Sequence, residues 1–335
     1  MSKNQSHPQQ AIGLDVGTSR VVMARRSGEQ YAFSSQLNAF VSVPFTRMTE
    51  NALKRENIPY TAHGTELIVL GNESTRFADL LSVETRRPMT AGTLNPGEKE
   101  SLSVIRSLIE TLNPNAAQEK PQVCFSVPSA PLGADENLTY HEATLRQVLG
   151  EMGYQPRSIN EGLAVIYSEL EDTNYTGIGI SCGGGLCNVS LAYLSMPVLS
   201  FSIPKAGDFI DTSAAAVTGE LATRIRLYKE ESFHFNGHFS DKLQQVLAVY
   251  YDDMIQALAA AMKEAIGSSR RLPKIGRPVP VVLSGGTTLP QGFRERFEKT
   301  LSETEMPLTI SEIRIAADPL HTTAKGALVA ALTEM

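Results

Sequence analysis

Short apolar segments separated by a glycine-bearing turn occur twice in the chain. Near the start, residues 11–16 and 21–24 are apolar, and Gly17-Thr18-Ser19 lies between them. This arrangement is typical of a β-hairpin. It returns about half a chain later, where residues 177–181 and 188–194 flank Cys182-Gly183-Gly184-Gly185, and a third strand is predicted over 198–203. The pattern predicts an internal duplication.

Other predicted elements repeat at a similar spacing. Residues 122–127 and 279–284 are typical of buried strands, and the second of them ends in Gly285-Gly286. Apolar positions at helical spacing predict helices over 102–112, 145–152 and 243–266. Strand hairpins that alternate with strands and helices favour mixed sheets covered by helices. The stretch from about 40 to 97 mixes short strands with polar segments, and we interpret it as a small subdomain inserted in the first half.

Composition excludes several classes of protein. The chain has 335 residues, of which 42% are hydrophobic and 20% charged, as in an ordinary soluble protein of about two domains. No apolar run approaches the roughly 20 residues that span a bilayer, and the polar N-terminus predicts neither a secretory signal nor a membrane anchor. We therefore expect a cytoplasmic protein, whose three cysteines stay reduced. A net charge of −6 without a basic run argues against sequence-independent nucleic-acid binding.

The glycine turns are candidate phosphate-binding sites. Without Cβ atoms, successive backbone N–H groups can converge on phosphate oxygens, and Thr18 and Ser19 add hydroxyl donors. Asp15 could hold a hydrated Mg²⁺, which takes one or two carboxylates plus substrate phosphates. Each turn taken alone could also be only a tight hairpin. The chain contains no P-loop, no dinucleotide-binding glycine fingerprint and no metalloprotease histidine pair.

At five places the sequence resembles the actin-like ATPases, the superfamily of actin, the heat-shock ATPases and the sugar kinases, and most of all bacterial actins of the MreB type. The resemblance covers nearly the whole chain. It implies a duplicated α/β fold of the ribonuclease H-like type, with two domains of mixed five-stranded sheet around a nucleotide cleft. The five segments, in the superfamily's order, are 14–19 (first phosphate loop), 159–164 (first connecting motif), 180–189 (second phosphate loop), 281–287 (adenosine motif) and 323–327 (second connecting helix).

The resemblance also implies domain boundaries and a cofactor. Domain I would comprise residues 1–155 and 315–335, and domain II residues 156–314, with a reduced subdomain at about 212–266. ATP, or another nucleotide, would bind with Mg²⁺ between them.

Site residues follow from the same resemblance. Asp15 would face the metal and take part in catalysis, and Glu161 would position the attacking water, since phosphoryl transfer depends on positioning and electrostatics. Arg226 stands loosely in the place of a nucleoside-contacting lysine, and Asp208 lies in a segment that follows the second hairpin. The remaining nucleotide contacts would come from Gly17, Thr18, Ser19, Gly183, Gly184, Gly185, Gly285, Gly286 and Thr287.

The second phosphate loop departs from the superfamily's pattern. Ser181 stands where an aspartate precedes the glycines, Leu186 replaces a threonine, and Asn188 replaces a second aspartate. Backbone donors and Mg²⁺ carry most phosphate affinity, so binding would survive. We expect slow hydrolysis, because the carboxylates that order the metal's waters are missing.

Three functions remain open from the sequence. The first is a cytoskeletal actin that polymerises head to tail, with self-association as the main partnership. The second is a weakly hydrolysing actin-like adaptor that docks unknown proteins in a division or pilus machinery. The third and most remote is a serine hydrolase with Ser181 as nucleophile, because residues 179–183 fit G-x-S-x-G and are followed by Asp208, Asp211, His234 and His238.

Overall fold

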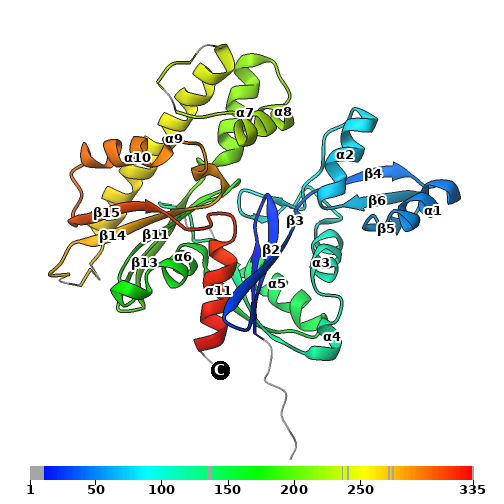
Figure 1. The fold of residues 1–335 in the computed structure, drawn as a ribbon, viewed down its shortest axis with the longest axis horizontal. Helices are drawn as coiled ribbons and strands as arrows, with labels where there is room; N and C mark the ends of the chain where they lie inside the picture. Colours follow the sequence, from blue (N-terminus) through cyan, green and yellow to red (C-terminus); the bar gives the residue numbers. More distant parts are fainter. Residues whose placement is uncertain are drawn as a thin grey trace, which may run out of the picture. The chain divides into compact units, whose positions relative to one another are not determined.

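The computed structural model describes residues 11–133, 138–235, 237–239, 241–270, 272–273 and 275–333. The chain divides into two compact units. Unit 1 comprises residues 1–125, 139–158 and 327–335, and unit 2 comprises residues 126–138 and 159–326. The structure is drawn in Figure 1, and each unit is described by itself.

Unit 1 is built on a five-stranded sheet with the order β10-β9-β1-β2-β3. β1 pairs antiparallel with β2 and parallel with β9, so the sheet is mixed. The side chains of Ile12 and Leu14 on β1 are fully buried, which places this strand in the core. The strands are β1 (Ala11–Val16), β2 (Arg20–Ser27), β3 (Gln30–Leu37), β9 (Gln122–Val127) and β10 (Gln155–Asn160).

Helices α3 (Ser101–Leu112) and α5 (Thr139–Glu151) belong to the same unit. α3 buries Val104, Ile105 and Leu108 at helical spacing, as the apolar pattern predicts. After α5, Gly153 adopts a φ of +94°, a conformation that ends a helix readily only with glycine. The short helix α4 (Ala116–Glu119) lies between α3 and β9.

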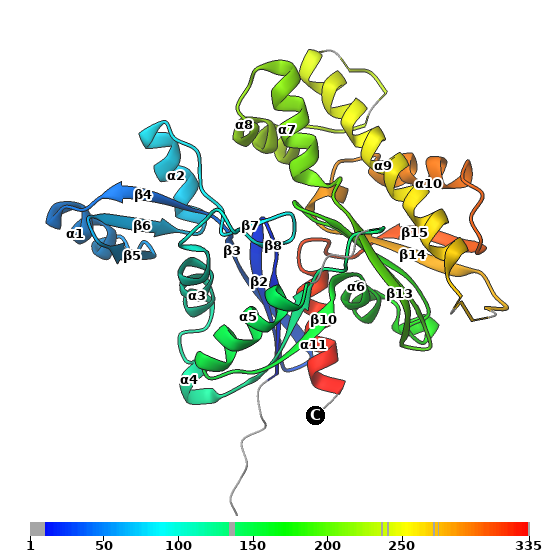
Figure 2. The ribbon, with the colours of Figure 1, turned by 180° about the vertical axis from the view of Figure 1, so that it is seen from behind.

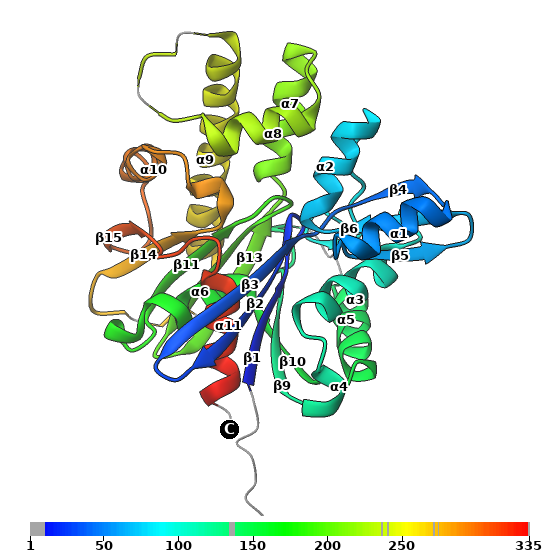
Figure 3. The ribbon, with the colours of Figure 1, turned by 45° about the vertical axis from the view of Figure 1, so that its right-hand side comes forward.

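The inserted segment forms a small layer of its own (Figure 3). Its core contains Val41, Leu53, Leu67 and Val69. Its three-stranded sheet has the order β4-β6-β5, and all neighbours are antiparallel. The subdomain comprises β4 (Phe40–Pro44), α1 (Arg47–Arg55), β5 (Tyr60–His63), β6 (Glu66–Leu70) and α2 (Asn72–Leu81), and β7 (Met89–Thr90) and β8 (Thr93–Leu94) follow as a two-stranded ribbon.

Unit 2 repeats the large sheet with the order β13-β12-β11-β14-β15. β11 pairs antiparallel with β12 and parallel with β14, just as β1 pairs with β2 and β9. The predicted duplication is therefore present strand for strand. The strands are β11 (Gly177–Cys182), β12 (Cys187–Tyr193), β13 (Met196–Ile203), β14 (Val279–Ser284) and β15 (Ile310–Ile315).

Both faces of the second sheet are covered, which explains why β11 is buried along its whole length. Ile178 and Ile180 point into the larger core, which α9 (Lys242–Ser268) and α10 (Phe293–Ser302) complete. Gly179 faces the other way, toward α6 (Glu161–Glu169), which packs against β11 and β12 (Figure 2). The other elements of this unit are η1 (Glu171–Thr173), α7 (Gly207–Thr218), α8 (Ala222–Glu231) and η2 (Gly286–Thr288), and α11 (Thr322–Thr333) begins in it.

The sequence pattern located the central elements closely. The strands predicted over 122–127 and 279–284 are observed at those residues, and the long predicted helix is α9. Among the residues that the structure describes, no helix combines the length and apolar character needed to cross a membrane.

Candidate functional site

The first glycine hairpin, in unit 1, is held in shape by hydrogen bonds within the turn and from neighbouring segments. Gly17 N donates to Arg20 O at 2.9 Å, which closes the turn between β1 and β2. Asn38 Nδ2 donates to Gly17 O at 2.8 Å, and Gly92 N donates to Thr18 Oγ1 at 3.1 Å. The Thr18 hydroxyl accepts in this contact, so its proton remains available to an acceptor such as a phosphate oxygen.

Asp15 lies beside this turn near the end of β1, opposite Val22. Its two carboxylate oxygens lie 4.0 Å from the position that a Cβ atom would occupy on Gly17. The side chain is half-buried. A single carboxylate next to a phosphate-binding turn is the donor set that Mg²⁺ uses when phosphates and water complete its shell. Within the described ranges, no group of three or more His, Cys, Asp or Glu residues could hold a metal by itself.

The second glycine hairpin, in unit 2, is fastened to the start of α7. Gly207 N donates to Gly183 O at 3.1 Å, and Asp208 N donates to Gly184 O at 2.7 Å. Thr287 Oγ1 donates to Gly183 O at 2.8 Å. The hairpin carbonyls are therefore occupied. In the part of the chain that the structure describes, the N–H groups of Gly184 and Gly185 donate to no protein acceptor, which leaves them available to an anion.

A buried ion pair between α8 and α7 supports the start of α7, to which the second hairpin is fastened. Lys229 Nζ lies 2.7 Å from Asp211 Oδ1, and both side chains are at most 7% exposed. The ammonium group also donates to Gly207 O at 3.1 Å. Burial raises the pKa of the Asp211 carboxyl although the Lys229 ammonium opposes the shift. Lys229 was not singled out from the sequence, and it follows the predicted contact residue Arg226 by three positions on α8.

The third glycine element brings the end of β14 against the end of β11. Gly285 has a φ of +93°, and a Cβ atom there would lie 2.2 Å from Cys182 O. Only glycine fits this approach. Gly285 N donates to Pro319 O at 3.0 Å, and η2 then carries Thr287 to the second hairpin. Thr287, Gly183 and Asp208, predicted from separate motifs, thus meet at one corner of unit 2.

Glu161, the first residue of α6, is held by the two residues that replace the superfamily's aspartates. Ser181 Oγ donates to Glu161 Oε2 at 3.1 Å, and Asn188 Nδ2 donates to the same oxygen at 3.0 Å. Asn188 Oδ1 in turn accepts from Ser129 N at 2.8 Å. Ser181 and Asn188 are paired across β11 and β12, so both point to the same side of the sheet. A carboxylate here is bound by neutral donors, where a second carboxylate would repel it.

The start of α6 is positioned by polar contacts and close packing. Asn160 caps the helix by accepting from Gly162 N at 3.1 Å, and Ser190 Oγ donates to the same Asn160 oxygen at 2.7 Å. A Cβ atom on Gly162 would lie 2.6 Å from Ser190 N. The orientation of Glu161 therefore follows from the capped helix end on which it lies.

α6 also crosses α11 at close range. A Cβ atom on Gly326 would lie 1.7 Å from the carbonyl oxygen of Ala164, so the two helices touch backbone to backbone at this point. The two connecting segments of the sequence motif, 159–164 and 323–327, are thereby brought together within unit 2.

The described part of unit 2 contains at least two pockets. One, of about 250 Å³, lies next to the third glycine element and is a candidate nucleoside pocket. It is lined by Lys229, Glu230, Glu231, Ser232, Phe233, His234, Leu289, Pro290 and Gln291.

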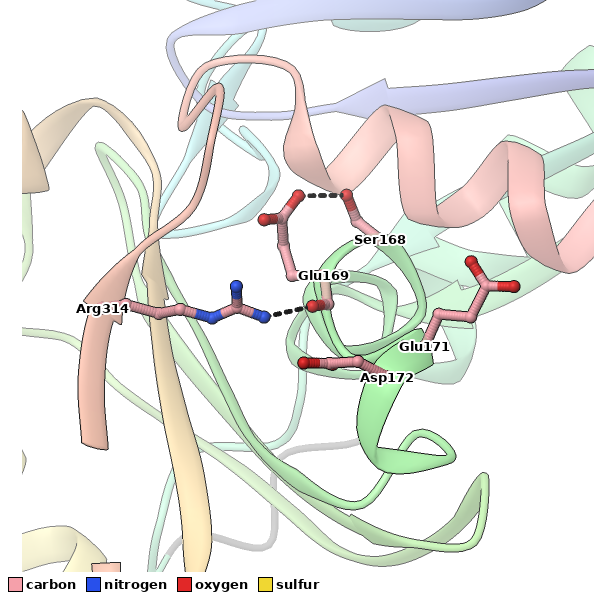
Figure 4. Close-up of a pocket in the computed structure, with 5 residues that line it drawn as sticks. All are labelled: Ser168, Glu169, Glu171, Asp172 and Arg314. Atoms are coloured by element: carbon pink, nitrogen blue, oxygen red, sulfur yellow. Dashed lines mark hydrogen bonds between the residues drawn. The ribbon is translucent and has the colours of Figure 1, made fainter. Parts of the chain in front are cut away.

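The other pocket, of about 440 Å³, lies at the far end of α6 (Figure 4). Ser168, Glu169, Glu171, Asp172 and Arg314 line it. Its strongest contacts are internal, because Ser168 Oγ donates to Glu169 Oε1 at 2.9 Å, Lys325 Nζ pairs with the same oxygen at 3.3 Å, and Arg314 Nη2 donates to the Glu169 carbonyl. The carboxylate of Glu169 is therefore compensated from within the fold.

The hydrolase alternative lacks the required local structure. A G-x-S-x-G nucleophile lies on a sharp turn between a strand and a helix. Ser181 lies inside β11, the next element is strand β12, and the Ser181 hydroxyl donates to Glu161.

Two residues were missed from the sequence, one at the first glycine hairpin and one in the hydrogen-bond network around Glu161. Asn38 is fully buried and ties the end of β3 to the first turn, and its Oδ1 has no hydrogen-bond partner among the residues that the structure describes. Ser129 anchors Asn188 through its backbone N–H. Neither has a sequence signal, because a lone asparagine or serine outside a motif does not show which distant segment it will contact.

The duplicated sheets, the hairpin that closes each, and the crossed connecting helices are the features of the actin-like fold. The fold that the resemblance in the sequence implies is confirmed, because solved structures with this fold match nearly the whole chain. Residues 10–331 match the model of the family described as Volactin, and the chain belongs to this family. A search of curated protein sequences found no match.

Three solved structures illustrate the similarity. The MamK double helical filament matches with a TM-score of 0.71 at 16% identity over 97% of this chain and 99% of that one. MreB5 of Spiroplasma citri bound to ADP matches with 0.70 at 15% identity over 98% and 97%. The ethanolamine utilization protein EutJ from Carboxydothermus hydrogenoformans matches with 0.59 at 16% identity over 97% and 91%. These matches confirm the expected fold class, a duplicated actin-like fold with two mixed five-stranded sheets.

Proposed function

We propose that the chain binds a nucleoside triphosphate with Mg²⁺ through both glycine hairpins and assembles with copies of itself into filaments. The observation that carries this proposal is the equivalence of the hairpins, which close the same pair of strands in two sheets of identical strand order. A glycine turn that served only to join two strands would not need to recur with its flanking hydrogen-bond donors.

The residues present fit such a ligand. In the second hairpin the N–H groups of Gly184 and Gly185 are available for phosphate oxygens, and in the first the Thr18 hydroxyl keeps a proton to donate. Asp15 would hold Mg²⁺ together with the phosphates, and the metal would supply charge neutralisation there. The 250 Å³ pocket beside Gly286 and Thr287 would take the nucleoside, with Arg226 as a further contact from α8.

Hydrolysis by this site would be slow. Glu161 Oε2 already accepts two hydrogen bonds, from Ser181 and Asn188, and no aspartate stands at either position. A carboxylate engaged in this way is a weaker acceptor for a proton of the attacking water. We infer that the nucleotide serves mainly to stabilise one conformation and that turnover is secondary.

Self-association is supported by the relatives. One is described as a double helical filament, another as a non-polymerising mutant bound to AMPPNP, and MreB5 is described as bound to ADP. We propose head-to-tail filaments in the cytoplasm. The network around Glu161 also suits the second candidate, an actin-like adaptor that binds nucleotide with little hydrolysis and docks other proteins.

Nucleotide binding can be tested with the purified chain and a fluorescent ATP analogue, with and without Mg²⁺. The affinity of wild type should rise with Mg²⁺. Asp15→Asn should lose most of this rise, whereas the matched control Asp79→Asn, an exposed carboxylate on α2, should keep it. Equal affinity in wild type with and without the metal, or an unaffected Asp15→Asn variant, would contradict the assigned metal site.

Assembly can be tested by ultracentrifugal pelleting and electron microscopy under the same conditions. Filaments that form with ATP and Mg²⁺ support the cytoskeletal function. A protein that binds nucleotide yet stays monomeric at high concentration favours the adaptor.

A further inference from the structure

Two cysteines lie directly opposite each other at the base of the second glycine hairpin, where β11 ends and β12 begins. Cys182 is the last residue of β11 and Cys187 the first of β12, and the two are register partners. Gly183 N donates to Leu186 O at 3.0 Å, so the neighbouring cysteine pair is a non-hydrogen-bonded pair of the antiparallel ladder. In such pairs the Cα atoms are about 4.5 Å apart, inside the range that a disulfide bridges.

The two thiols touch in the core of unit 2. Both side chains are fully buried and free. A hydrogen bond with the Cys182 side chain, followed by burial, raises the pKa of the Cys187 thiol well above its ordinary value. The Cys187 thiol also donates to Lys205 O at 3.3 Å, two residues before Gly207, which holds the hairpin. The third cysteine, Cys124, lies in unit 1.

We propose that Cys182 and Cys187 form an intramolecular disulfide across the base of the hairpin when the protein meets a peroxide. One thiolate attacks a peroxide oxygen, the O–O bond breaks, and a sulfenic acid and hydroxide result. The second thiolate attacks the sulfenic sulfur, the S–S bond forms, and hydroxide leaves. In balance, two thiols and one hydrogen peroxide give one disulfide and two waters, so the cysteines lose two electrons that the peroxide gains.

The reaction is gated by the hairpin. The thiolate is the reactive form, both side chains are buried, and the pKa of the Cys187 thiol is raised, so oxidation requires the ends of β11 and β12 to open. Oxidation is therefore slower than that of free cysteine and becomes faster as the pH rises.

Once formed, the bond removes the Cys187 donor from Lys205 O and fixes the width of the turn. If the hairpin binds phosphates, as the proposed function states, nucleotide affinity falls several-fold on oxidation.

The test treats the folded chain with hydrogen peroxide, alkylates the remaining thiols after denaturation, and analyses tryptic peptides by mass. Both cysteines lie in the peptide 158–205, which contains no internal Lys or Arg, whereas Cys124 lies in another peptide. That peptide should escape alkylation, lose about 2 Da relative to its reduced form as two hydrogens leave, and recover after dithiothreitol. Cys124→Ser should behave as wild type, and Cys182→Ser and Cys187→Ser should each abolish the change.

Two results would overturn the proposal: alkylation of both cysteines after peroxide treatment, or a cross-link that appears only in denatured protein. The disulfide is detected by mass alone, so this test of its formation does not depend on nucleotide binding. An unchanged nucleotide affinity in fully oxidised protein would remove only the functional consequence, and an absence of binding in the reduced protein would contradict the proposed function instead.

Discussion

Asn188 Nδ2 lies 3.0 Å from Glu161 Oε2 and donates a hydrogen bond to it. The same amide group receives Ser129 N on its oxygen at 2.8 Å, which fixes the direction in which it can donate. An asparagine that is locked in this way cannot turn to offer its oxygen to Glu161. The Glu161 carboxylate therefore always faces the N–H group of Asn188 and not its oxygen.

Asn188→Asp should reverse this relationship. The new carboxylate still accepts from Ser129 N but faces Glu161 with like charge, and one hydrogen bond to a charged group is lost. We expect a loss of roughly 2 kcal/mol in unfolding free energy at neutral pH, measured by urea denaturation. The loss should shrink in acid, where protonation removes one of the two charges, and it should shrink with Mg²⁺ and ATP if the site binds the metal. A variant as stable as wild type at neutral pH would contradict the assigned contact.

Ser181→Asp combined with Asn188→Asp should speed ATP hydrolysis if the slow turnover that we propose comes from the missing carboxylates. We expect an increase of at least about 10-fold in phosphate release, which corresponds to about 1.4 kcal/mol of barrier. Adding Glu161→Gln to the double variant should abolish the gain. Phosphate release that stays at the wild-type rate in the double variant would show that some other feature limits turnover.

His141 should make the protein acid-sensitive. Burial lowers the pKa of this imidazole from 6.5 to about 4, although the neighbouring Glu142 carboxylate opposes the shift. Its Nδ1 accepts from Leu94 N at 3.3 Å, so the neutral ring is the form that fits. The unfolded chain binds the proton more tightly, so stability is full above pH 6.5 and falls as the pH drops toward 4. Between pH 7 and pH 5 the loss should be about 2 kcal/mol.

Urea denaturation at the two pH values checks this prediction. The variant His141→Gln, whose amide oxygen can still accept from Leu94 N, should lose most of the difference. An equally steep dependence in that variant would assign the acid sensitivity to other groups.

Lys229→Met should destabilise unit 2 by roughly 3 kcal/mol, because it leaves the buried Asp211 carboxylate without its partner. Adding Asp211→Asn should recover a large part of the loss, which thermal or urea unfolding can measure. The control Arg224→Met removes an exposed cation of the same helix, which forms a surface ion pair with Glu220 at 3.6 Å, and should change stability little. Equal losses of unfolding free energy in Lys229→Met and Arg224→Met would mean that the buried Lys229–Asp211 pair stabilises the fold no more than an exposed pair does.

Gly326→Ala should disrupt the crossing of α6 and α11. The added Cβ would lie 1.7 Å from Ala164 O. This oxygen belongs to the backbone of α6, which cannot move without disturbing the helix. We expect a loss of roughly 3 kcal/mol by thermal unfolding. Gly150→Ala on α5 is the matched control, because nothing lies within 4 Å of its Cβ position, and it should stabilise by up to about 1 kcal/mol. A tolerated Gly326→Ala would refute the close crossing.

The sequence predicted elements that carry strong periodicity or glycine punctuation. The β1–β2 and β11–β12 hairpins and α9 were located from such patterns, because burial on one or both faces dictates the residue types. The edge strand β3 was missed, since most of its residues are exposed or half-exposed and show no apolar alternation.

The candidate site divides in the same way. Gly285 could be recognised because its positive φ and its close approach to Cys182 O require glycine. Lys229 could not, because a lysine on a helix is usually solvated and only the fold shows that this one is buried against Asp211. The domain boundaries, the assigned site residues and the roles of the nucleotide stay predictions.

The crossing of α6 by α11 has a consequence for folding during synthesis on the ribosome. The surface around Ala164 is complete only when Gly326 has been synthesised, roughly half the chain later. Until then α6 presents an uncovered strip of backbone and apolar side chains to the cell, and its closure requires a contact of very long sequence separation. We expect the nascent chain to depend on chaperones during this interval, and the synthesis of α11 to allow this part of unit 2 to fold.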